Sequence, residues 1–325
     1  MGLFEDLQYM TGPALQARLN QYQAIGAKWA RFQLIWSNVQ SGGPGSYDWQ
    51  PYDELIAGLV ARGIQPLVVI DTTPSWARPA DCREQPTCAP ADPAQYAQFA
   101  AAAVARYHSE VHHWEIWNEP NNNVFWQPAP DVGAYTALLK LTYAAIKSID
   151  PGAEVITGGT APEETTRGAN GETVSISPVD FLAGIYRNGG GGSFDAVGAH
   201  PYTFPEMPGS SNPGDAWAQL EATATSMRSL MVAHGDGSKL IWGTEFGAHT
   251  DPAGQGYVDE AEQAAILTRG YRLWSSYSWT GPLIWFSYQD IGVDPALRDD
   301  FFGLTQADGA PKPAYFAFKA LAGTG

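Results

Sequence analysis

Basic residues are scarce in this sequence of 325 residues. Lys and Arg together number 18 against 34 Asp and Glu, which gives a formal net charge of −16 at pH 7. A surface of that sign repels phosphate backbones and anionic membranes, so nucleic acid is a poor candidate partner. Only six residues are Lys, and none of them ends a strand-like apolar run. The sequence therefore offers no obvious residue for Schiff-base chemistry.

Membrane, nucleotide and metal motifs are also missing. No apolar stretch reaches the ~18 residues of a membrane-spanning helix, and no signal peptide opens the sequence. No GxGxxG, GxxxxGKS, CxxC or Cys/His metal pattern occurs. Charged residues are only 16% and hydrophobic residues 44% of the total, which argues against disorder and allows a large core. We expect neither a metal nor a cofactor.

Cysteine is limited to Cys82 and Cys88, six positions apart in a Pro-rich loop. This spacing permits a small disulfide clip. An acidic, Lys-poor, Trp-rich composition is typical of exported proteins, in which such loops are oxidised. We therefore predict a disulfide and an extracellular or cell-envelope location, for which a signal segment would have been removed.

The order of elements predicts an α/β fold, a (β/α)₈ TIM barrel in a single domain over residues 1–325. Apolar, β-rich runs alternate with Ala- and Leu-rich helical runs, as in a parallel sheet built from βα units. The first strand is short or trimmed, because only Gly2 to Phe4 precedes the first helix. The other strands are expected at 29–36, 66–71, 114–118, 154–157, 194–200, 240–245 and 283–287. The helices are expected near 13–25, 52–62, 93–108, 132–148, 178–187, 215–234, 259–276 and 312–321.

Two of these strands end in carboxylates, Glu119 after the fourth and Glu245 at the seventh. The active site of such a barrel lies at the carboxyl ends of its strands. Glycosidic cleavage needs one acid to protonate the leaving oxygen and one carboxylate behind the anomeric carbon, about 5–5.5 Å away in retaining enzymes. The acid must hold a proton, whereas the nucleophile must stay ionised, favoured by a cation such as Arg31.

The sequence around these carboxylates resembles the clan A glycoside hydrolases. Trp117-Asn118-Glu119-Pro120 is similar to their fourth-strand motif, and Glu245 in Trp-Gly-Thr-Glu-Phe-Gly to their seventh-strand nucleophile. Within the clan, the run 114–121 followed by Phe125-Trp126 looks most like family 39, with the family 5 cellulase-like enzymes second. The resemblance covers nearly the whole chain, and its further residues are Arg31, His200-Pro201-Tyr202, Trp285 and Lys312-Pro313-Ala314-Tyr315.

This resemblance implies roles for the residues around the carboxylates. Asn118 would bind the sugar 2-hydroxyl, a contact that strengthens in the transition state. Arg31 and Tyr202 would hold the nucleophile, and His200 would line the same wall. Trp285 would be the platform under the sugar in the cleavage subsite.

Other polar and aromatic residues have two readings each. Glu115 is a competitor for catalysis, although a buried ion pair with Arg31 is favoured because it lies deeper in the strand. Asp71 could cap the next turn or touch substrate. Trp36, Trp76 and Trp126 could stack sugars away from the cleaved bond or pack under loops, with the ligand role favoured for Trp126. Packing roles are favoured for Trp242, His112 and His113.

The residues together predict a retaining β-glycoside hydrolase, with Glu119 as general acid/base and Glu245 as nucleophile. The alternative is a non-catalytic carbohydrate-binding barrel, whose hallmark would be the loss of a carboxylate. Without a cationic cluster, a neutral β-linked glycan is the expected substrate. Loops near 159–178, 203–215 and 248–259 could form a groove or a closed pocket. We expect a monomer.

Overall fold

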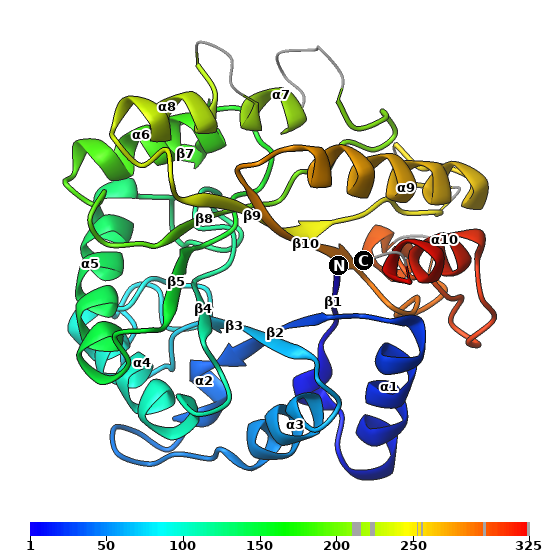
Figure 1. Cartoon of the computed structure of the whole chain (residues 1–325). Helices are drawn as coiled ribbons and strands as arrows, with labels where there is room; N and C mark the ends of the chain where they lie inside the picture. Colours follow the sequence, from blue (N-terminus) through cyan, green and yellow to red (C-terminus); the bar gives the residue numbers. More distant parts are fainter. Residues whose placement is uncertain (210–215, 222–224, 252, 255, 295–296, 324–325) are drawn as a thin grey trace.

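The computed structural model describes residues 1–209, 216–221, 225–251, 253–254, 256–294 and 297–323. Within these ranges eight parallel strands close into a barrel in the order β1-β10-β9-β8-β5-β4-β3-β2, which confirms the predicted fold (Figure 1). The strands are β1 (Gly2–Phe4), β2 (Trp29–Ile35), β3 (Gln65–Asp71), β4 (His113–Ile116), β5 (Glu154–Thr157), β8 (Ala196–Ala199), β9 (Leu240–Phe246) and β10 (Thr280–Phe286).

The short first strand closes the barrel. Gly2 pairs with Trp29 of β2 on one side and with Ile284 of β10 on the other. A Cβ atom at Gly2 would lie 2.3 Å from Ile284 Cδ1 and 2.6 Å from Trp29 Cβ. Only glycine leaves room for both neighbours to approach this closely.

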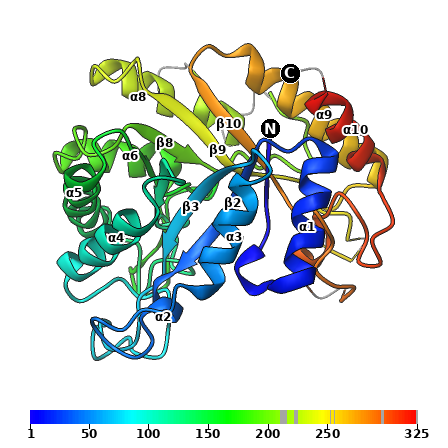
Figure 2. The same cartoon turned by 60° about the horizontal axis from the view of Figure 1, so that its bottom comes forward.

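The helices form a ring outside the strands (Figures 1 and 2). They are α1 (Gly12–Ile25), α2 (Trp36–Val39), α3 (Gln50–Val60), α4 (Pro93–Tyr107), α5 (Val132–Ile149), α6 (Pro178–Arg187), α7 (Ala216–Leu220), α8 (Met227–Ala233), α9 (Glu260–Ser276) and α10 (Pro313–Ala322). The single helix predicted near 215–234 is wrong. Its place is taken by α7 and α8, and residues 222–224 between them lie outside the described residues. Every described helix is too short or too polar to cross a lipid bilayer.

The apolar core has two layers. The larger one lies between the strands and the helices, and a smaller cluster that includes Leu67, Ile156 and Trp242 joins side chains of six barrel strands. Trp242 packs against Trp29, with ring centroids 5.1 Å apart, and His113 contacts the same two rings. Burial lowers the pKa of His113 to about 4. Trp242 and His113 therefore have the packing roles that the sequence favoured.

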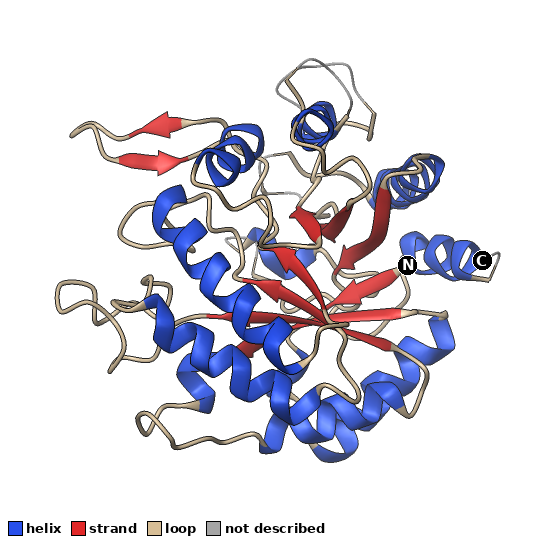
Figure 3. Cartoon of the chain, turned by 60° about the vertical axis from the view of Figure 1, so that its left-hand side comes forward, coloured by secondary structure: helices blue, strands red, loops and turns tan. Residues whose placement is uncertain are grey.

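A hairpin of β6 (Thr166–Arg167) and β7 (Thr173–Ser175) follows β5 and stands away from the barrel (Figure 3). It occupies the loop expected near 159–178. Its second strand returns toward the loop after β4, where Asn122 forms an isolated bridge with Ser175. The hairpin therefore ties the loops after β4 and β5 together on one side of the barrel mouth.

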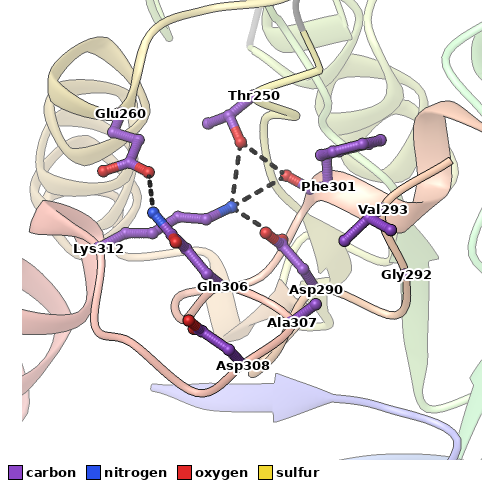
Figure 4. Close-up of a pocket in the computed structure, with 10 residues that line it drawn as sticks. All are labelled: Thr250, Glu260, Asp290, Gly292, Val293, Phe301, Gln306, Ala307, Asp308 and Lys312. Carbon is purple, nitrogen blue, oxygen red and sulfur yellow. Dashed lines mark hydrogen bonds and ion pairs between the residues drawn. The ribbon is translucent and has the colours of Figure 1, made fainter. Parts of the chain in front are cut away.

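The last helix is fixed by a buried ion pair. Lys312 precedes α10, and its Nζ lies 2.8 Å from Asp290 Oδ1 and 3.0 Å from Thr250 Oγ1 (Figure 4). The Phe301 carbonyl accepts a third, longer bond of 3.4 Å. Burial lowers the pKa of Lys312 and raises that of Asp290, and each charge offsets the effect on the other. These residues line a pocket of about 370 Å³. Since the three protons of Lys312 all have acceptors here, we interpret Lys312 as a structural anchor for the helix.

Candidate active site

A pocket of about 480 Å³ opens at the carboxyl ends of the barrel strands. Both carboxylates singled out in the sequence, Glu119 and Glu245, contribute to its wall. Asn118 and Tyr202 also line it, as the resemblance implied. Its remaining lining residues are Phe4, Asp6, Gln33, Phe125, Ala161, Pro162, Glu163, Phe204, Phe286, Ile291, Arg298, Asp299 and Phe302.

Glu245 is held by two donors at the end of β9. Arg31 Nη1 donates to Oε1 at 2.5 Å, and the Tyr202 hydroxyl donates to Oε2 at 2.8 Å. Burial alone would raise the pKa of this carboxyl. The positive charges of His200 and Arg31 and the hydrogen bonds from Tyr202 and Arg31 outweigh burial, so its pKa lies below the usual range. Glu245 therefore has the environment of an ionised nucleophile.

Arg31 is fully buried at the centre of this network. Its Nε donates to Glu115 Oε2 at 2.7 Å, and its Nη2 reaches Glu115 Oε1 at 3.2 Å and Asn118 Oδ1 at 2.8 Å. Glu115 also accepts from Thr244 Oγ1 and from the Gly159 amide. Glu115 is thus the buried ion-pair partner of Arg31, the reading favoured from the sequence. The Glu115 carboxylate, whose oxygens already accept these hydrogen bonds, does not line the pocket.

Glu119 reaches the pocket through an irregular turn after β4. The strand ends at Ile116, and both Trp117 (φ 73°) and Glu119 (φ 44°) adopt the left-handed conformation. Such residues cost of order 1–3 kcal/mol each and persist where the surroundings impose them. Regular strand alternation would place residues 115, 117 and 119 on one side, but Trp117 departs from it. Its indole N–H donates to the Phe125 carbonyl at 2.6 Å, and its ring packs on Trp126.

His200 lies between the two carboxylates. Its Nδ1 is 2.8 Å from Glu119 Oε1 and 3.6 Å from Glu245 Oε2. One carboxylate oxygen of each Glu and one ring nitrogen of His200 all lie within 4.8 Å of one another. Because a carboxylate only accepts hydrogen bonds, Nδ1 carries a hydrogen whenever Glu119 is ionised. His200 therefore bridges the two acids.

The same three residues have the spacing of a metal site, the one such group in the described part of the chain. Both oxygens of Glu245 already accept hydrogen bonds, however, from Arg31 and Tyr202. The guanidinium charge beside Glu245 repels a second cation. The arrangement is therefore better suited to proton transfer and nucleophilic attack than to holding a metal ion.

Two of the tryptophans predicted to contact sugar are buried in the protein, and a third is half-buried. Trp36 packs against Phe99 and Trp76, and its indole N–H donates to Gln40 Oε1. Trp126 packs between Trp117 and Tyr135. The sugar-contact predictions for Trp36 and Trp126 are therefore wrong. Half-buried Trp76 donates to the Gln40 carbonyl and does not line this pocket.

The platform predicted at Trp285 is also wrong. Trp285 is fully buried against Phe246, and its indole N–H donates to the Phe302 carbonyl. The next residue, Phe286, lines the pocket instead. Alternation along β10 was the available signal, because Ile284 faces the barrel interior and so predicts Phe286, two positions later, on the same side.

Several polar residues of the site were not singled out in the sequence. Gln33 lies two positions after Arg31 on β2 and lines the pocket. Its Nε2 donates to Asp71 Oδ2 at 3.3 Å. Asp71 is buried and also accepts from the Thr72 amide, which favours the capping reading. Asp6 comes from the loop after β1, and Arg298 and Asp299 come from a short 3-10 helix, Arg298–Phe301, so no strand alternation specifies the directions of these side chains.

Cys82 and Cys88 form the predicted disulfide, with their Cα atoms 6.1 Å apart. The bonded loop leads into the segment before α4, and the Gln127 carbonyl accepts from the Ala89 amide. The disulfide thereby fixes a long loop after β3 beside the loop after β4.

The comparisons with known proteins agree with this geometry. A family 39 glycoside hydrolase from Bacteroides cellulosilyticus WH2 superposes with a TM-score of 0.76 at 25% identity, covering 99% of this chain and 63% of that one. The GH39 enzyme from Xanthomonas axonopodis pv. citri gives 0.69 at 26% identity, with 99% and 66% covered. This chain is related to the family 39 glycoside hydrolases. The preference for family 39 over family 5 is thus confirmed, although no family model matches the sequence.

A curated relative is a β-xylosidase from Geobacillus stearothermophilus. It is 28% identical over 222 residues, which cover 64% of this chain and 41% of the relative. The chain thus spans less than two thirds of the length of this relative and of the two family 39 structures. A family 1 β-glucosidase from Thermotoga maritima, 14% identical with a TM-score of 0.63, shares the fold.

Proposed function

We propose that this chain hydrolyses β-glycosides by double displacement, with retention of configuration, and that residues 1–325 act as one catalytic domain. The observation that carries the proposal is the approach of Glu119 and Glu245 to within 4.8 Å at the mouth of the barrel. Retaining enzymes hold these carboxyl groups about 5–5.5 Å apart, whereas inverting enzymes leave about 6.5–9.5 Å for a water molecule.

The two environments support different roles. Glu245, kept ionised by Arg31 and Tyr202, attacks the anomeric carbon and forms a glycosyl ester. Glu119 donates its proton to the departing oxygen as that C–O bond breaks. Water then attacks the anomeric carbon, Glu119 takes one of its protons, and the ester bond to Glu245 breaks. Asn118 lines the pocket beside Glu119, where its side chain can bind the sugar 2-hydroxyl.

A neutral sugar is the proposed substrate. Five carboxylates line the pocket, from Asp6, Glu119, Glu163, Glu245 and Asp299, whereas Arg298 is its one cation among the described residues. This balance disfavours uronic acids and sulfated sugars. Because one relative is named a β-xylosidase, β-xylosides are the first glycosides to test. Chemistry of this kind needs no cofactor or metal.

Export to the extracellular space or cell envelope is proposed on two grounds. The chain carries a disulfide and a net charge of −16. Disulfides of this kind persist in oxidising compartments. Fractionation of the native source, followed by detection of the chain in the culture medium or envelope, tests this; recovery with reduced thiols from the cytosol would contradict it.

Covalent labelling tests the hydrolase proposal. Aryl β-glycosides, beginning with the β-xyloside, identify a substrate, and the matching 2-deoxy-2-fluoro glycosyl fluoride should then add one sugar mass to the peptide containing Glu245. Glu245→Ala should abolish labelling and turnover. Glu119→Ala should lose about 10²- to 10⁴-fold on natural glycosides and less on an aryl glycoside, whose leaving group needs no proton. Wild-type rates in both variants would sink the proposal.

A further inference from the structure

A third carboxylate lies beside Glu119 and is not used in the chemistry above. Glu163 follows β5, is half-buried and lines the same pocket. Asn122 Nδ2 lies 3.3 Å from Glu119 Oε2 and 3.3 Å from Glu163 Oε1, so one amide group joins the two acids. Glu163 is therefore next to Glu119, the group proposed to protonate the leaving oxygen.

The backbone that carries Glu163 is rigidly placed. The Asn121 side chain donates to the carbonyls of Ala161 and Ile176 and accepts from the Ala161 amide. The Glu163 amide in turn donates to the Ala161 carbonyl at 2.8 Å. These bonds lock the loop after β5 against the loop after β4. A binding group on such a support loses little conformational entropy when a ligand binds.

Asn122 is fixed as well. Its Oδ1 accepts from the amides of Val124 and Phe125 at 3.0 and 3.1 Å, which sets the orientation of its amide group. Nδ2 is thereby directed at the two carboxylates. The same contacts hold Phe125, whose ring lines the pocket together with Ala161 and Pro162. The loops after β4 and β5 thus supply an apolar wall and a carboxylate, the combination that a sugar ring with several hydroxyls requires.

We infer, on the basis of the proposed hydrolase function, that Glu163 forms the leaving-sugar subsite and accepts hydrogen bonds from the hydroxyls of the sugar that is released. A carboxylate has about four acceptor positions, of which Asn122 and Ser175 take one each on Glu163. The pKa of Glu163 lies above its usual range. Burial and the charge of Glu119 raise it, and hydrogen bonds from Ser175 and Asn122 offset part of the rise. In either protonation state its oxygens accept from hydroxyls.

The test compares two substrates of the same glycone sugar. One is the aryl β-glycoside that the wild-type chain cleaves fastest, and the other is the β-linked disaccharide of that sugar. Glu163→Gln should lower kcat/KM for the disaccharide about 10- to 100-fold more than for the aryl glycoside, because hydrogen bonds to a charged group are lost. The adjacent exposed Glu164→Gln makes the same chemical change and should leave the ratio unchanged.

A second measurement uses the glycosyl-enzyme itself. With the aryl glycoside as donor, transfer to added free sugar should fall in Glu163→Gln, whereas transfer to methanol, which needs no such subsite, should persist. Glu163→Asp, which keeps the charge on a shorter side chain, should recover part of the loss; it also serves if the Gln variant fails to fold. Equal losses on both substrates and both acceptors would overturn this inference alone, whereas a wild-type chain inactive on all glycosides would overturn the proposed function too.

Discussion

At the scale of single residues, the two glutamates of the site have identical side chains but different surroundings. Glu245 faces a buried guanidinium and a phenol. Glu119 faces an imidazole and an amide. The positive charge beside Glu245 favours its anion, which suits the nucleophile.

Tyr202→Phe should change the pH dependence of activity. The hydroxyl of Tyr202 lowers the pKa of Glu245, so its removal raises that pKa. Because attack requires ionised Glu245, the acid limb of kcat/KM should move to higher pH. The rate should fall about 10- to 100-fold with the loss of a hydrogen bond to a charged group. A pH–rate profile checks this.

Exposed Tyr257→Phe is the matched control and should keep the wild-type profile. An unmoved acid limb in Tyr202→Phe, with the rate reduced, would show that the phenol does not act through the charge of Glu245.

Asp71→Asn should change how stability depends on pH. Burial raises the pKa of Asp71 to about 7, even though the Thr72 amide and Arg31 favour its charged form. An unfolded Asp loses its proton near pH 4, so between about pH 4 and 7 the folded state holds the extra proton and stability falls as pH rises. The Asn variant lacks this loss.

The unfolding free energy of Asp71→Asn relative to wild type should therefore rise from pH 4 to pH 8, by about 4 kcal/mol if the shift of roughly three units is fully expressed. Urea unfolding across this range measures it. Exposed Asp81→Asn should track the wild type, and parallel curves for Asp71→Asn would refute the shift.

At the scale of elements, the anchor before α10 depends on paired charges. Lys312→Ala leaves the Asp290 carboxylate buried without its cation, which typically costs 3–5 kcal/mol. The midpoint of urea unfolding should fall accordingly. Lys319→Ala, in the exposed last turn of the same helix, should change it by less than about 0.5 kcal/mol. If the two variants are equally stable, the ion pair has no net structural role.

The strands were predictable, whereas the turn after β4 was not. Alternating apolar runs place a strand and its mouth residues to within a few positions, which was enough for Glu119, Glu245 and Arg31. The left-handed backbone at Trp117 and Glu119 is imposed by tertiary contacts such as the Glu119 amide to the Gly159 carbonyl. No local pattern specifies this conformation. Trp126, which packs against Trp117 of the turn, was therefore wrongly predicted to contact sugar.

At the scale of the whole molecule, the charge of −16 should make stability depend on salt. Like charges spread over one domain repel each other, and added salt screens them. At pH 7 the urea midpoint should rise between 20 mM and 500 mM NaCl. Near pH 4.6, the isoelectric point of the sequence, the same salt step should have a smaller effect. A larger effect at pH 4.6 would show that pairs, not net charge, dominate.

The fold and the catalytic pair could be predicted because both follow from periodic patterns and strand ends. The walls of the pocket could not, since residues such as Asp6, Phe125 and Glu163 lie in loops whose positions depend on distant partners. The aromatic residues show the same division. Sugar contacts were considered for Trp36, Trp126 and Trp285, but burial removes all three from the surface.

The pairing of β1 with β10, which closes the barrel, has a consequence for biosynthesis. β1 precedes the other barrel strands in the sequence, yet it can pair with its second neighbour only after β10 has been translated. Until then the nascent sheet presents unpaired backbone along two margins, and such margins invite pairing with other chains. Because the contact that closes the ring joins strands far apart in the sequence, we expect ring closure to be a slow folding step, during which the open sheet needs protection from other chains.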